Sequence, residues 1–116
     1  MGMRSTTQAF QFDVPFEQLF QLATPAAQSV PKATVTLADP NRQVVTFDTP
    51  MGMMSWGENI VAGFIPSGGS TIVEVTCTTK GLPNLMQDGR NRKKIKQYID
   101  GLSGILQVSA TEVIPS

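Results

Sequence analysis

The feature of this 116-residue chain that most suggests a function is a cluster of positive charge near its C-terminal end. Five of the nine cationic residues fall within seven consecutive positions, 90–96. On a helix with 100° between residues, Arg90, Lys93 and Lys94 face away from the apolar stripe of that segment. Arg92 and Lys96 lie on one shoulder. The cluster is either the solvated face of an amphipathic helix or a basic face for an anionic partner, which would offset the small cost of cations at a helix start.

Next to this cluster stand two residues that cap helices well, Asp88 and Asn91. Both fall on the core-facing side of the same helix, and capping is the simpler interpretation. The alternative is a carboxylate and an amide that point into a cleft between helix and sheet. They would then orient a polar ligand, with Arg92 as counter-ion on the rim of the cleft.

A methionine-rich segment suggests a second kind of site. Residues 50–55 have neither helical nor strand periodicity and contain Met51, Met53 and Met54. Because Met fills irregular space and adapts to varied ligands, these side chains and Trp56 form a candidate apolar lining. Trp56 as a core anchor at a strand start is the alternative. Glu58 shares a strand face with Trp56, and burial there would raise the pKa of its carboxyl group.

Several classes of chemistry lack the residues that they require. The chain contains no His, which excludes His-based acid–base catalysis and His metal ligation. The single cysteine, Cys77, can form neither an internal disulfide nor a Cys-cluster metal site, and no His is present to activate it. A lone acid, Glu58 or Asp88, is weak support for an enzyme. We therefore expect no metal and no cofactor, and an enzyme ranks last among the function classes.

The net charge of zero conceals an asymmetry along the chain. Residues 1–80 carry four cations and six anions, whereas residues 81–116 carry five cations and three anions. A neutral domain with one aromatic residue, Tyr98, beside its basic cluster argues against a nucleic-acid partner. The apolar stretches are too short for a membrane span and the N-terminus lacks a signal-peptide pattern, so we expect a cytoplasmic protein.

Hydrophobic periodicity predicts the elements that position these side chains. Alternation typical of strands covers residues 8–14, 34–38, 44–49, 56–65 and 71–79. Helical spacing covers residues 16–30 and 88–106. Pro25 lies inside the first helix and predicts a kink or a break there.

This order, β-α-β-β-β-β-α, predicts an α+β fold with a single antiparallel sheet of about five strands and both helices packed on one face. The expected domain spans residues 7–106, after a flexible N-terminus at residues 1–6. Residues 107–116 form either a tail or an extra short strand. The opposite face of the sheet must meet water, a partner or another layer.

Two short motifs carry a resemblance to known proteins. A Ser55-Trp56-Gly57 step before a hairpin and the Gly89-Arg90-Asn91 opening of a basic helix resemble a family of small uncharacterised bacterial α+β domains. That family's pattern has an acidic residue two places before the glycine, where this chain has Gln87. The resemblance covers residues 7–106 and implies a fold and a bacterial cytoplasmic setting, but no chemistry. The element order is also similar to a shortened START-like helix-grip domain, in which a sheet wraps a long C-terminal helix around an apolar cavity.

The leading functional hypothesis is a non-enzymatic binding module. Its cleft, lined by the methionines, Trp56 and the flank of the last helix, would take an apolar ligand or an apolar segment of another protein. The first alternative is anion or nucleic-acid contact through the basic face. The second is self-association into a homo-oligomer through the open sheet face or the tail.

Overall fold

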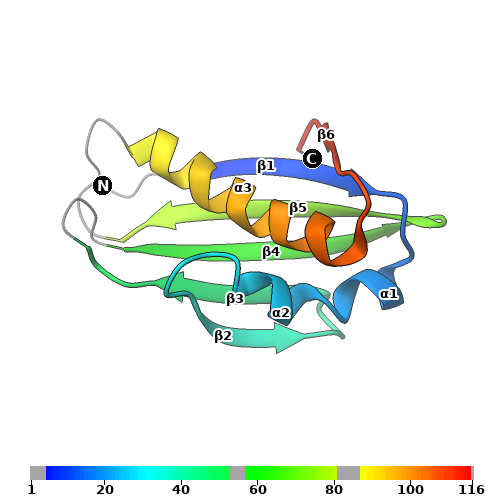
Figure 1. Ribbon diagram of the computed structural model, residues 1–116, viewed down its shortest axis with the longest axis horizontal. Coiled ribbons are helices and arrows are strands. Elements are labelled where there is room, and N and C mark those ends of the chain that lie inside the picture. The colour runs from blue at the N-terminus through cyan, green and yellow to red at the C-terminus, as the bar shows by residue number, and fades with distance from the viewer. Residues whose placement is uncertain (1–4, 53–56, 81–86, 116) are drawn as a thin grey trace.

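The computed structural model describes residues 5–52, 57–80 and 87–115 (Figure 1). Its elements are, in order, β1 (Ser5–Phe12), α1 (Phe16–Phe20), α2 (Ala23–Ala27), β2 (Thr34–Asp39), β3 (Val44–Thr49), β4 (Glu58–Ser67), β5 (Ser70–Thr79), α3 (Gln87–Leu106) and β6 (Thr111–Val113). Strand β1 begins at Ser5, two residues before the expected start of the domain. Strand β6 lies in the segment for which the sequence left a tail or a strand open.

The six strands form one antiparallel sheet in the order β2-β3-β4-β5-β1-β6. Strands β4 and β5 are the longest, at 10 residues each, and pair as a hairpin along their full length. Strand β1 pairs with β5, and the short β6 pairs with the other side of β1. The expected α+β architecture is confirmed, and the described residues form six strands in place of about five and three helices in place of two.

The first expected helix is divided into α1 and α2, and the interruption lies at residues 21–22 rather than at Pro25. Pro25 is the third residue of α2, in the first turn, where backbone N–H groups have no partner inside the helix. A proline at this position therefore removes no helical hydrogen bond. Because the proline is accommodated in the first turn of α2, the helix is interrupted before Pro25 and not at it. Among the described helices, none combines the length and the apolarity that a membrane crossing requires.

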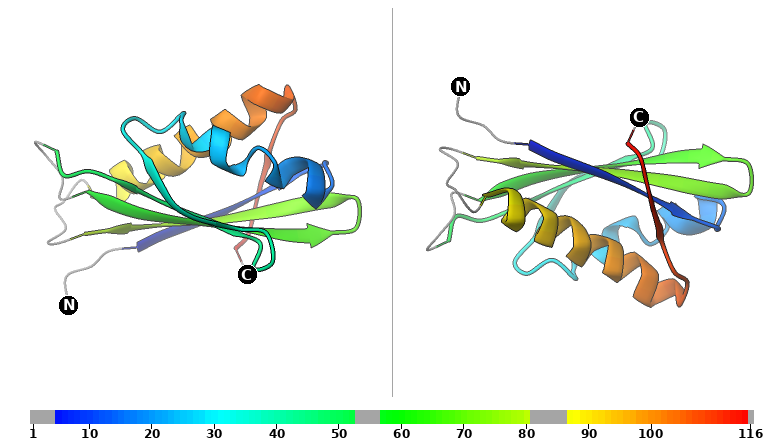
Figure 2. Two further views of the ribbon diagram at one scale, coloured as in Figure 1. Left: turned by 90° about the horizontal axis from the view of Figure 1, so that it is seen from below. Right: turned by 90° about the horizontal axis from the view of Figure 1, so that it is seen from above.

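The hydrophobic core lies between the inner face of the sheet and the three helices, which all pack on that face (Figure 2). Among its members are Phe12, Phe47, Ile60, Phe64, Val75, Ile95, Tyr98 and Leu102. Tyr98 of α3 is fully buried, and its ring centroid lies 5.1 Å from that of Phe47. Its hydroxyl donates a 2.8 Å hydrogen bond to the backbone oxygen of Ala23 in α2. The only polar atom of this side chain is thus satisfied where no water reaches it.

None of the described helices covers the outer face of the sheet (Figure 2), and along β1 and β5 this face carries polar side chains. Exposed hydroxyl pairs run across β1 and β5: Thr7 with Thr76 at 2.9 Å, and Ser5 with Thr78 at 2.8 Å. Such cross-strand pairs stabilise a sheet without apolar burial. The described part of this face is therefore compatible with direct contact with water.

Helices α2 and α3 cross at close range, and Gly101 permits the approach. A Cβ atom at Gly101 would lie 2.8 Å from the Cβ of Ser29 and 2.9 Å from the backbone oxygen of Ala26. A Cβ atom at Gly104, three residues later, would meet nothing within 4 Å. Both glycines lower the helix propensity of α3 by the same amount, but only Gly101 is needed for the close contact with α2.

We expect alanine at these two positions to change stability in opposite directions. Gly104→Ala should raise the free energy of unfolding by about 0.5–1 kcal/mol, because Ala is the better helix former and the space is open. Gly101→Ala should lower it by about 1–3 kcal/mol, because the backbone of α2 must move. Urea denaturation of both variants checks this, and equal effects would contradict the close packing of α2 on α3.

Candidate functional site

A cleft opens to solvent between the end of β3, the start of β4 and the first half of α3. We call it the β3–α3 cleft. Its lining consists of Pro31, Lys32, Thr49, Pro50, Met51, Gly52, Glu58, Arg90, Lys93, Lys94 and Gln97. Its volume is about 430 Å³. Three stretches far apart in sequence meet there: the chain after α2, the β3–β4 connection and α3.

The cleft unites residues that the sequence assigned to two separate hypotheses. Met51 belongs to the candidate apolar lining and Glu58 is the carboxyl group expected beside it, whereas Arg90, Lys93 and Lys94 belong to the basic face. The remaining members of the candidate apolar lining, Met53, Met54 and Trp56, lie outside the described residues. The two kinds of residue thus form one candidate site with a basic wall.

Glu58 forms part of the floor of the cleft and is 2% exposed. Strand register places it between Thr49 of β3 and Thr79 of β5. The Thr49 hydroxyl donates a hydrogen bond to the Glu58 carboxylate, and the Glu58 backbone N–H donates to the same hydroxyl oxygen at 3.0 Å. A carboxylate that is buried and held in this way is part of the protein's own hydrogen-bond network.

The walls of the cleft carry positive charge that the described protein does not neutralise by ion pairs. Lys32, Arg90, Lys93 and Lys94 all line the cleft. None of them belongs to an ion pair between described residues. Glu58 is the single acidic residue of the lining. The cleft therefore attracts anions.

Asp88 and Asn91 do not line this cleft. They connect α3 to β1 through hydrogen bonds with Thr6. The Thr6 hydroxyl donates to Asp88 Oδ1 at 2.7 Å and accepts from Asn91 Nδ2 at 3.3 Å. Asn91 is completely buried, so it points between helix and sheet, but the partners that the structure gives it are protein groups. Sequence analysis missed Thr6 because it began the strand at residue 8, whereas β1 begins at Ser5 and the alternation that buries Phe12 also directs Thr6 to the inner face, opposite Cys77.

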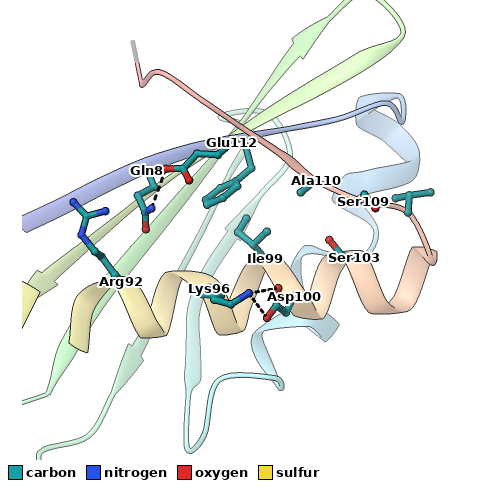
Figure 3. Close-up of a pocket in the computed structure, with 11 residues that line it drawn as sticks. Gln8, Arg92, Lys96, Ile99, Asp100, Ser103, Ser109, Ala110 and Glu112 are labelled. Carbon is teal, nitrogen blue, oxygen red and sulfur yellow. Dashed lines mark hydrogen bonds and ion pairs between the residues drawn. The ribbon is translucent and has the colours of Figure 1, made fainter. Parts of the chain in front are cut away.

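A second depression, the α3–β6 groove, lies on the other flank of α3 and has a volume of about 500 Å³ (Figure 3). It is lined by Gln8, Phe10, Arg92, Lys96, Ile99, Asp100, Ser103, Val108, Ser109, Ala110 and Glu112. Arg92 and Lys96 are therefore separated from the other three cations. Their charges are already matched, because Arg92 pairs with Asp88 at 2.9 Å and Lys96 with Asp100 at 3.1 Å. Although larger, this groove offers a ligand fewer unpaired groups than the β3–α3 cleft.

Cys77 lies under α3, fully buried, with its thiol 3.4 Å from Asn91 Oδ1. Burial, assisted by the negative charge of Glu58 and opposed by the positive charge of Lys94, raises the pKa of the Cys77 thiol to about 12. The thiol is therefore protonated at neutral pH, and it is the thiolate that acts as a nucleophile. Cys77 has the properties of a core residue.

Comparison with models of protein families finds no match for this chain, and comparison with curated proteins finds none.

Solved structures share the fold. Ara h 8.0201 aligns with a TM-score of 0.69 at 13% identity, over 91% of this chain and 99% of that one. A START superfamily protein from Mycobacterium smegmatis aligns with 0.64 at 12%, over 92% and 98%. Norcoclaurine synthase from Thalictrum flavum, in complex with dopamine and hydroxybenzaldehyde, aligns with 0.66 at 8%, over 90% and 87%. At identities this low, the alignments show the fold alone. They confirm the START-like helix-grip architecture expected from the element order.

The raised pKa of Cys77 predicts a loss of stability in alkali. The thiol has an ordinary pKa of 9.0, so the unfolded chain loses this proton near pH 9 while the folded protein keeps it to about pH 12. The stabilisation is complete below pH 9 and is lost as pH rises toward 12. Between pH 8 and pH 11, the free energy of unfolding should fall by about 2 kcal/mol more in the wild type than in Cys77→Ala. Urea denaturation at both pH values measures this, and parallel losses would contradict it.

Proposed function

We propose that the protein is a non-enzymatic binding module that holds a small, partly apolar ligand in the β3–α3 cleft. The observation that carries the proposal is the meeting of Met51 and Glu58 with three cations of α3 around one solvent-open volume of about 430 Å³. Small-molecule sites typically measure about 300–1,000 Å³ and combine apolar walls with a few polar groups. The β3–α3 cleft has both properties.

The apolar part of the cleft is its outer rim. Pro31, Pro50 and Met51 line it, and Met51 is 66% exposed. A large apolar side chain left in water at the edge of a cleft gains stabilisation when a ligand covers it. The flexible thioether side chain also adapts to ligands of different shape. These residues would hold the apolar part of the ligand.

The shared fold supports a ligand-binding role at the level of architecture. Norcoclaurine synthase, in the structure that aligns with this chain, is in complex with two small aromatic compounds. A protein with this fold is therefore able to bind small molecules. Which compounds this chain would take must follow from its own residues, since the shared identity is 8%.

The alternatives receive less support from the described residues. Nucleic acid needs a continuous basic surface, whereas α3 carries Arg90, Lys93 and Lys94 on one flank and places Arg92 and Lys96 in ion pairs on the other. Self-association through the outer sheet face would bury exposed hydroxyl pairs of β1 and β5 that are already hydrogen-bonded to each other. Both alternatives therefore rank below a ligand cleft.

We also propose that the chain is a cytoplasmic bacterial protein of the small α+β family that its motifs resemble. The glycine of the Ser-Trp-Gly motif, Gly57, supports this, because its backbone has a φ of +94°. A Cβ atom there would lie 2.6 Å from the backbone oxygen of Thr49. Glycine at this position is thus a requirement of the strand entry.

A bulky residue at the edge of the cleft should block ligand uptake. Gly52 lines the cleft and has nothing within 4 Å of a Cβ position, so Gly52→Phe places a ring at the opening without a clash at Cβ. We expect a neutral solvatochromic dye such as Nile red to bind the wild type and to bind Gly52→Phe about tenfold more weakly. Fluorescence titration measures both affinities.

The matched control is Gly69→Phe in the β4–β5 turn, where a Cβ atom also meets nothing within 4 Å and which lines neither the β3–α3 cleft nor the α3–β6 groove. This variant should bind the dye as the wild type does. Absence of dye binding to the wild type, together with absence of any co-purified small molecule in native mass spectrometry, would contradict the proposal. Equal weakening by both variants would place the dye elsewhere.

A further inference from the structure

The distribution of charge in the β3–α3 cleft indicates the chemical class of the ligand, which the volume alone does not. Lys32 reaches the cleft from the chain after α2, and Arg90, Lys93 and Lys94 reach it from α3. Elsewhere in the described chain, four cations are each paired with a carboxylate at 2.9–3.6 Å. The cations of the cleft form no such pair. An anion that enters the cleft reduces the repulsion among these like charges.

Two polar atoms of the cleft lining are also withdrawn from water without compensation. Arg90 Nε and Gln97 Oε1 are buried, and neither makes a hydrogen bond within the described part of the chain. A buried donor or acceptor without a partner costs about 1–3 kcal/mol, more when it is charged. Both residues line the same cleft, seven positions apart on α3, so they lie on one stripe of the helix. Lys93 and Lys94 lie between them.

We propose that the β3–α3 cleft selects amphipathic ligands with an oxyanion head, a carboxylate or a phosphate ester, bound by Arg90 and Lys94. This inference rests on the proposed function, because it names the class of ligand for the same cleft. The oxyanion pairs with the Arg90 guanidinium and neutralises the neighbouring lysine. The apolar body covers Pro31, Pro50 and Met51 at the rim.

The α3–β6 groove provides the internal comparison. It contains two cations of the same helix, Arg92 and Lys96, but both are paired with carboxylates on the following turn or the preceding turn. On the flank of α3 that faces the α3–β6 groove, the cations form ion pairs with carboxylates. On the flank that faces the β3–α3 cleft, they form no ion pair with a described residue. A general solvated basic face would not differ between its flanks in this way.

The test compares three ten-carbon probes by isothermal titration calorimetry: decanoate, decyl phosphate and decanol. We expect both anions to bind the wild type about tenfold or more tightly than decanol, since charge-assisted hydrogen bonds exceed neutral ones. The preference should decrease as salt rises. The order of decanoate and decyl phosphate distinguishes the two sources of the oxyanion.

Two double variants remove equal charge from opposite flanks of α3. Arg90→Gln/Lys94→Gln should abolish the preference for the anions over decanol. The control, Arg92→Gln/Lys96→Gln, should keep the preference. Circular dichroism and thermal unfolding establish that both variants fold.

Equal binding of decanoate and decanol to the wild type would overturn the inference and leave the binding module intact. An anion preference that survives Arg90→Gln/Lys94→Gln would also overturn it. Binding of inorganic phosphate alone, without uptake of any ten-carbon probe, would support the anion site and contradict the apolar ligand. No binding of any probe would contradict both proposals.

Discussion

Helix α3 rests on the inner face of the sheet through one apolar stripe, and the burial of that stripe determines where almost every other feature lies. Tyr98 is at its centre, against Phe47 and hydrogen-bonded to Ala23. Burying a large side chain contributes about 1.5–3 kcal/mol, and its satisfied hydroxyl adds about 1 kcal/mol. Since the helix has one such stripe, it has one rotation on the sheet. That rotation directs one flank of α3 to the β3–α3 cleft and the other to the α3–β6 groove.

Two glycines allow the backbones to approach closely enough for this arrangement. Gly101 admits α2 beside α3, and Gly57 allows the chain to enter β4 directly beside the end of β3. The second approach brings Glu58 opposite Thr49 at the floor of the cleft. Neither role follows from helix or strand propensity, which treats a glycine in either position as a local weakness.

Several residues of the candidate site could be predicted from the sequence, but not that they meet in one cleft. Composition and spacing identified Met51, Glu58 and the basic cluster, because unusual side chains stand out in a sequence. They could not show that Lys32 and Gln97 complete the same cleft. Lys32 follows a helix by a few residues and resembles any solvated lysine, and Gln97 has no charge to mark it. Their participation depends on the crossing of α3 over the sheet.

By itself, the sequence determined the α+β class, the antiparallel pairing and the buried faces of the long elements, because periodicity is a local property that burial on one face imposes on neighbouring residues. It also determined that the chain lacks the residues for histidine, disulfide or cysteine-cluster chemistry. Only the tertiary structure decided which charged residues share a cleft. Arg92 pairs with Asp88 and Lys96 with Asp100 at a spacing of four residues, which the sequence itself contains. Arg90 and Lys94 instead meet Lys32 and Met51 around the β3–α3 cleft. That meeting arises from contacts between distant segments, which local spacing does not encode.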